Sequence, residues 1–116
     1  MNNASINQLV GKTFDRVYTN DEVSELLFVS ENETYKFYHS QDCCEDVVIE
    51  DICGDLSDLI GTPIVEAREE TNAEYVNDDE NEWTFYTFRT IKGTVTVRWH
   101  GSSNGYYSMY VSFAKV

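Results

Sequence analysis

One short pattern occurs twice in this 116-residue chain, fifty positions apart. The first copy runs from Ser5 to Gly11 and the second from Gly54 to Gly61. In each copy a polar capping position precedes apolar residues on one helical face, and a glycine ends the turn. The apolar residues of the two copies are Ile6, Leu9 and Val10, then Leu56, Leu59 and Ile60. The repetition predicts two short helical turns and a chain built by internal duplication.

Runs of alternating apolar and polar residues separate and follow these turns, which is typical of half-buried β-strands. They predict a mostly β fold, an antiparallel sheet or sandwich of about eight strands, in a single domain over 1–116 with pseudo-repeats at about 5–53 and 55–116. Segment 72–82 has no counterpart in the first half and is predicted to be an exposed acidic insertion. The strands are expected at 12–18, 23–30, 34–39, around 47–49, and at 62–70, 83–91, 94–100 and 106–113.

The formal net charge of −13 is unevenly distributed along the chain. Residues 41–82 carry fifteen acids and one base, whereas residues 83–116 carry four bases and no acid. Such a surface repels phosphate backbones, so direct nucleic-acid binding is disfavoured and a protein with a basic surface is the expected partner. No apolar run reaches the roughly 20 residues of a membrane helix. Three cysteines and the absence of a secretory signal favour a reducing cytoplasm.

The expected contacts with a basic partner come from acids in and beside the insertion. Alternation from Ile64 to Glu70 places Glu66, Arg68 and Glu70 on one face, with about 6.5–7 Å between alternate side chains. Phosphates along a DNA strand have a broadly similar separation, so these acids allow mimicry of DNA, with a merely solvated acidic surface as the alternative. The predicted partner-binding residues are Glu66, Glu69, Glu70, Glu74, Asp78, Asp79, Glu80 and Glu82.

Two corners of the chain share an aromatic–histidine pair followed by a polar turn. They favour an alternative function, a small-ligand site built from both corners. The first corner offers Tyr38, His39, Gln41, Asp42 and Glu45, and the second offers Arg98, His100, Asn104, Tyr106 and Tyr107. Consecutive aromatic residues such as Phe85-Tyr86 also place one ring outward, where nearby basic residues allow a basic-aromatic ligand face.

The residues of the first corner give weak support for metal binding or for a nucleophilic cysteine. His39, Cys43 and Cys44 include metal-ligand types, but the paired spacing of structural zinc sites is absent. The acids beside the thiols disfavour a nucleophilic thiolate. We therefore predict no catalytic residue, no cofactor and no metal ligand, and a metal site at this corner stays open as a third alternative.

Several blocks resemble an uncharacterised domain family of small bacteriophage and prophage proteins. They are Tyr38–Glu45, Ile49–Ile52, Gly54–Leu56, Trp83–Tyr86, and Arg98–Trp99 with Ser103–Ser108. The family has no agreed activity, so the resemblance implies no site residues. It implies a viral origin and a host-facing role.

Together these observations predict a non-enzymatic acidic phage protein that binds and inhibits a factor in the host cytoplasm. A nucleic-acid-dependent defence system such as CRISPR machinery is the expected type of target. The alternative is a small-ligand binding or sequestering protein that uses the His39 and His100 corners.

Overall fold

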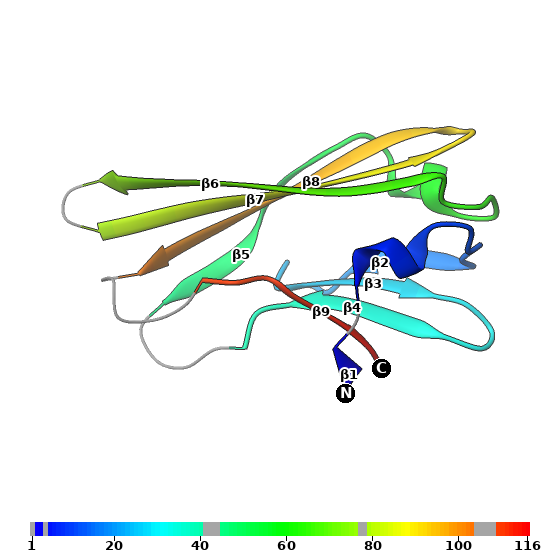
Figure 1. Cartoon of the computed structure of the whole chain (residues 1–116), viewed down its shortest axis with the longest axis horizontal. Helices are drawn as coiled ribbons and strands as arrows, with labels where there is room; N and C mark the ends of the chain where they lie inside the picture. The colour runs from blue at the N-terminus through cyan, green and yellow to red at the C-terminus, as the bar shows by residue number, and fades with distance from the viewer. Residues whose placement is uncertain (1, 4, 41–44, 77–78, 104–108) are drawn as a thin grey trace.

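The chain folds into two stacked β-sheets whose paired strands run antiparallel (Figure 1). The computed structural model describes residues 2–3, 5–40, 45–76, 79–103 and 109–116. Within them, sheet I has the order β1-β9-β4-β3-β2 and sheet II the order β5-β8-β7-β6. The elements are β1 (Asn2–Asn3), η1 (Ile6–Leu9), β2 (Arg16–Thr19), β3 (Glu25–Val29), β4 (Thr34–Tyr38), β5 (Asp46–Cys53), η2 (Leu56–Leu59), β6 (Glu66–Val76), β7 (Asp79–Thr90), β8 (Gly93–Ser103) and β9 (Ser112–Lys115).

The predicted fold class is confirmed, since the described chain is mostly antiparallel β with two 3₁₀ turns. Each turn begins at a capping residue, Ser5 or Asp55, whose side chain accepts a hydrogen bond from the N–H two residues later. The strand predicted from Val23 begins at Glu25 instead. Val23 has a φ of 49°, and this left-handed conformation lies outside the range of a β-strand.

Several other strands also differ from the prediction, among them β6, which covers Glu66–Val76 where 62–70 was expected. The strand expected from Lys12 begins at Arg16, after an isolated bridge between Phe14 and Ile60. The last strand is β9, over Ser112–Lys115, and residues 106–108 of the strand expected at 106–113 lie outside the described residues. The two-residue strand β1, which pairs with β9, has no alternating pattern to predict it.

Each half of the chain gives its last strand to the other sheet. Strands β2, β3 and β4 form a meander in sheet I, and the next strand, β5, pairs with β8 of sheet II. In the same way β6, β7 and β8 form a meander in sheet II, and β9 returns to pair with β4. The sheets are therefore connected by the chain in both directions as well as by packing.

The glycine after each 3₁₀ turn is hydrogen-bonded to the segment that follows the other turn. The N–H of Gly11 donates to the carbonyl of Ile64 at 2.7 Å, and the N–H of Gly61 donates to the carbonyl of Phe14 at 2.9 Å. Both glycines have a positive φ, 87° and 79°, a conformation that favours glycine. At an offset of fifty residues the two hydrogen bonds are equivalent, so the halves meet symmetrically here.

The acidic segment 72–82 lengthens two paired strands. β6 and β7 stay in register from Glu66 opposite Arg89 to Val76 opposite Asp79. In the first half, the β2–β3 pairing ends where Thr19 faces Leu26. The additional residues thus build a long β6–β7 hairpin, seen at the upper left of Figure 1.

Aromatic side chains fill the space between the sheets. The ring of Phe28 on β3 lies 5.0 Å from that of Phe88 on β7, and the ring of Phe37 on β4 lies 4.6 Å from that of Tyr86 on β7. Trp99 is also buried in this cluster. Because both sheets contribute rings, the core fixes one sheet against the other.

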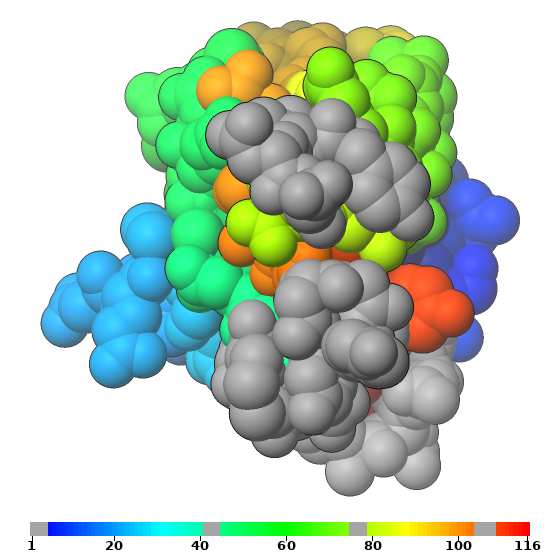
Figure 2. All heavy atoms as spheres, turned by 90° about the vertical axis from the view of Figure 1, so that its left-hand side faces the viewer, coloured from blue at the N-terminus to red at the C-terminus, as the bar shows by residue number. Residues whose placement is uncertain are grey.

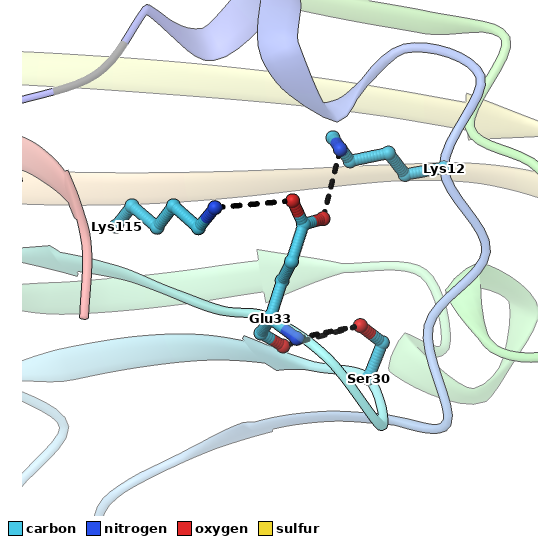
Figure 3. Close-up of polar contacts among 4 residues, drawn as sticks. All are labelled: Lys12, Ser30, Glu33 and Lys115. Carbon is cyan, nitrogen blue, oxygen red and sulfur yellow. Dashed lines mark hydrogen bonds and ion pairs between the residues drawn. The ribbon is translucent and has the colours of Figure 1, made fainter.

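Glu33 ties three segments together at the surface, as Figure 3 shows. Its carboxylate accepts from the Nζ atoms of Lys12, at 2.8 Å, and of Lys115, at 3.3 Å. The hydrogen bond from Lys12 holds the pKa of Glu33 below its usual range, and the same bond raises the pKa of Lys12. The turn between β3 and β4 is thereby held to the segment after η1 and to β9.

Candidate functional site

The outer face of sheet II, which points away from sheet I, brings outward aromatic rings and acids together. On β7 the rings of Trp83 and Phe85 are partly exposed on this face, whereas Tyr86 is 1% exposed and faces the core. The prediction that one ring of Phe85-Tyr86 faces outward is confirmed. Sequence reasoning did not place Trp83 in a site, although the alternation along β7 assigns it to the same face as Phe85.

A hollow of about 250 Å³ opens on this face, and we call it the outer hollow. The register places Asn72, Trp83 and His100 opposite one another on three neighbouring strands. In the adjacent row, Phe85 lies opposite Arg98. The lining residues of the hollow are Asn72, Glu74, Trp83, Phe85 and Arg98.

The two basic residues of β8 on this face, Arg98 and His100, have partners. An Nη atom of Arg98 lies 2.9 Å from a carboxylate oxygen of Glu50 and 3.9 Å from one of Asp51, while its Nε is buried with no hydrogen-bond partner among the described residues. His100 Nε2 lies 2.9 Å from Asn81 Oδ1, and its ring is 5.1 Å from that of Trp83. The charge of Arg98 is therefore balanced by β5.

The predicted acidic residues divide between the two faces of the hairpin. Those at even positions of β6 and odd positions of β7 face outward, whereas the others face the space between the sheets. Arg68 contacts Glu66 at 3.4 Å and Glu70 at 3.9 Å, so these three share one face as predicted. Arg89 also contacts Glu66, at 3.7 Å. The outward acids are Glu66, Glu70, Glu74 and Asp79, the inward acids are Glu69, Glu80 and Glu82, and Asp78 lies outside the described residues.

The inward acids repel one another. Burial raises the pKa of Glu82 first, and the charges of Glu80 and Glu69 raise it further. Burial also raises the pKa of Tyr86 well above its usual range, together with the charge of Glu69 and a hydrogen bond with it. Like charges facing each other near a core lower the stability of the folded chain at neutral pH.

We expect Glu82→Gln to raise the melting temperature at neutral pH. The folded-state pKa of Glu82 is raised, so its ionised form disfavours folding, and stability increases as pH falls through that pKa. The substitution removes this penalty, so its advantage over the wild type shrinks as pH falls. Thermal melts across a pH series test it against the exposed control Glu31→Gln, which changes the same charge. Equal effects of both variants at every pH would contradict the argument.

The first predicted corner holds a buried contact between His39 and Glu45. His39 Nε2 lies 3.0 Å from Glu45 Oε1, and their side chains are 6% and 0% exposed. His39 Nδ1 lies 2.7 Å from the carbonyl oxygen of Tyr110, just before β9. Each ring nitrogen of His39 therefore has an oxygen atom within hydrogen-bond distance. Tyr38 lies on the opposite face of β4, beneath the ammonium group of Lys36.

The described residues of the two corners do not meet in one pocket. His39 is buried at the end of β4 in sheet I, whereas His100 lies on the outer face of sheet II. Thr34 opposite Val29 corresponds to Thr94 opposite Arg89, so the second meander is offset by sixty residues. The structural counterpart of His39 is thus the core residue Trp99. Gln41, Asp42, Cys43, Cys44, Asn104, Tyr106 and Tyr107 lie outside the described residues.

The described part of the chain gives little support for a metal site or a membrane-spanning helix. There, no three His, Cys, Asp or Glu side chains gather as metal ligands, and Cys53 is exposed with a free thiol. Nor do the described residues include a helix long and apolar enough to cross a membrane.

A family model described as Domain of unknown function (DUF7448) matches residues 7–113. The chain belongs to this family. The DUF7448 match includes η1 from its second residue, all of η2, both meanders and the acidic hairpin, so it reaches beyond the blocks that carried the resemblance. That resemblance is confirmed in its coarser form, as a family of unknown function. No curated protein and no solved structure shows significant similarity to the chain.

Proposed function

We propose that this DUF7448 protein is a non-enzymatic interaction protein that binds the basic surface of another protein through its β6–β7 hairpin. The observation that carries the proposal is the presentation of carboxylates on both faces of this one long hairpin. Figure 2 looks onto the end of the molecule where residues of β7 and β8 reach the surface. A cationic partner relieves the repulsion among Glu69, Glu80 and Glu82, so binding recovers stability that the free protein lacks.

The free edge of the hairpin favours a partner other than a second copy. Within the described residues β6 pairs with β7 on one side and has no strand on the other. An eleven-residue edge of this kind invites strand pairing, and charged side chains along it discourage pairing between like-charged copies. A basic partner meets no such repulsion.

We further propose that the partner is a host protein. The resemblance to phage proteins supports a host target, and the acidic face supports competition with nucleic acid for a basic groove in a defence system. On the outer face of β6, however, the acids Glu66, Glu70 and Glu74 recur every fourth residue, about 13 Å apart. Arg68 lies between the first two. This face alone does not reproduce a continuous row of phosphates, so the inward acids have to contribute.

The alternative of a small-ligand site shared by the histidine corners has less support. Its described members lie in different sheets, and His39 and His100 both already contact protein oxygen atoms.

The test compares two variants of equal net charge. Asp79→Asn/Glu80→Gln/Glu82→Gln neutralises the hairpin, and Asp15→Asn/Asp21→Asn/Glu31→Gln neutralises three exposed acids of the first half. Nuclease-treated host lysate is passed over each immobilised protein at about 0.1 M and about 1 M salt, where the Debye length falls from about 10 to 3 Å. We expect the wild type and the control to retain the same basic protein at low salt only, and the hairpin variant to retain several-fold less.

Equal retention by the two variants would show that net charge alone attracts the retained protein and would overturn the assignment to the hairpin. Retention of no protein by the wild type at either salt would overturn the proposed function itself.

A further inference from the structure

We propose that the outer hollow binds an arginine side chain of the partner protein, held between the Trp83 and Phe85 rings and the Glu74 carboxylate. This inference rests on the proposed function and names the contact that anchors the partner. The outer faces of the two sheets differ in what lies over their aromatic rings.

On sheet I, outward aromatic rings are covered by the protein's own cations. The guanidinium carbon of Arg16 lies 4.4 Å from the ring centroid of Tyr18, and Nζ of Lys36 lies 4.9 Å from that of Tyr38. In both pairs the cation is two residues before the ring on the same strand. Cation–π contacts of this kind stabilise a partly exposed ring without burying it in a core.

On sheet II, no lysine or arginine of the described residues makes this contact with an outward ring. Among the described residues no lysine or arginine lies over Trp83 or Phe85, and the residue two positions before Trp83 is Asn81. The rings nevertheless lie beside a carboxylate, since Glu74 lines the same hollow. Within the described part of the chain, that carboxylate makes no ion pair or hydrogen bond. The hollow therefore offers a cation the faces of two aromatic rings and a carboxylate with which it can pair.

Charge and size both exclude a larger anionic ligand from the outer hollow. The guanidinium group of Arg98 is already paired with Glu50 and Asp51, so its charge is balanced within the protein. A volume of about 250 Å³ lies below the range of about 300–1,000 Å³ typical of sites for drug-sized molecules. One side chain from a protein surface is the occupant of matching size and charge.

The arrangement favours arginine over lysine. A guanidinium group is planar, stacks on aromatic faces and donates two parallel hydrogen bonds to a carboxylate. Trp83 and Phe85 supply the faces and Glu74 the carboxylate, and the amide oxygen of Asn72 at the same wall is a further acceptor. A lysine ammonium is more strongly hydrated and makes no stacking contact.

The experiment titrates the full-length protein with hexa-arginine and hexa-lysine peptides at low salt and follows the indole N–H signals by NMR. Two tryptophans allow an internal comparison, because Trp83 lines the hollow and Trp99 is 1% exposed in the core. We expect hexa-arginine to bind more tightly than hexa-lysine and to shift the Trp83 signal much more than that of Trp99.

The decisive variant is Trp83→Leu, which removes the ring and leaves the net charge unchanged. We expect it to weaken hexa-arginine binding about threefold to thirtyfold, the range that corresponds to the strength of a cation–π contact. Trp83→Phe keeps a ring and should bind nearly as the wild type does. Ile91→Ala, which trims an 86% exposed apolar residue elsewhere, is the matched control for loss of surface apolar area. Native NMR dispersion verifies the folding of each variant.

Equal hexa-arginine affinity of Trp83→Leu and the wild type, or an unmoved Trp83 signal at saturation, would overturn this inference. If the hairpin-neutralised variant still lost binding in that case, the proposed function would stand without the arginine pocket. If neither peptide bound the wild type at low salt, both would fail.

Discussion

Phe28→Ala is expected to lower the free energy of unfolding by about 3–5 kcal/mol, the usual cost of truncating a buried aromatic ring. Phe28 is 0% exposed and its ring contacts three others. The centroid distances are 5.3 Å to Phe14, 5.9 Å to Phe37 and 5.0 Å to Phe88. Phe88 belongs to sheet II, so the substitution opens a cavity at the contact between the two sheets.

Equilibrium denaturation by urea measures this loss. Phe28→Leu, which retains most of the apolar volume, should lose clearly less, and the exposed control Ile91→Ala should stay within about 0.5 kcal/mol of the wild type. If Phe28→Ala is too unstable to purify, Phe28→Leu still reports the loss. Wild-type stability of both Phe28 variants would show that this cluster does not join the sheets.

The sequence predicted the two 3₁₀ turns and most strands because the relevant signals are local. Glycines at 11 and 61 and apolar residues at matched positions need no knowledge of the rest of the chain. The exchange of β5 and β9 between the sheets could not be predicted in this way. An alternating strand satisfies its hydrophobic face equally well beside either meander, so the pattern does not select the neighbour.

The two histidine corners show how a single residue of register changes a site. Matching Tyr38-His39 with Trp99-His100 gives an offset of sixty-one, whereas the strand pairing gives sixty. Because side chains alternate between faces, that one-residue difference moves a side chain from the core to the outer surface. The acids of the hairpin divide between two faces for the same reason, and only the pairing of β6 with β7 shows which acids repel each other.

The sequence around Glu45 does not indicate that this residue is buried. It follows a polar turn in the most acidic part of the chain, and such positions are usually solvated. Its environment is set by His39 and by the strand exchange that brings the segment before β9 beside β4. Burial of this carboxylate is therefore a consequence of topology.

His39→Leu is expected to lower the free energy of unfolding by about 3 kcal/mol, because it removes the imidazole from a carboxylate that is 0% exposed. Glu45→Leu should cost a similar amount, since the ring then loses its acidic partner. Replacing both partners of a buried polar contact by apolar residues is often nearly neutral, so His39→Leu/Glu45→Leu should recover much of the loss.

Urea denaturation of all four proteins gives the coupling free energy between the two side chains. Glu25→Gln, which removes the partly exposed contact with Lys36 at 3.1 Å, is the matched control and should change stability far less. Additive losses in the double variant would show that the two side chains act separately. The burial of Glu45 would then depend on contacts other than His39, and the corner would not be held by this pair.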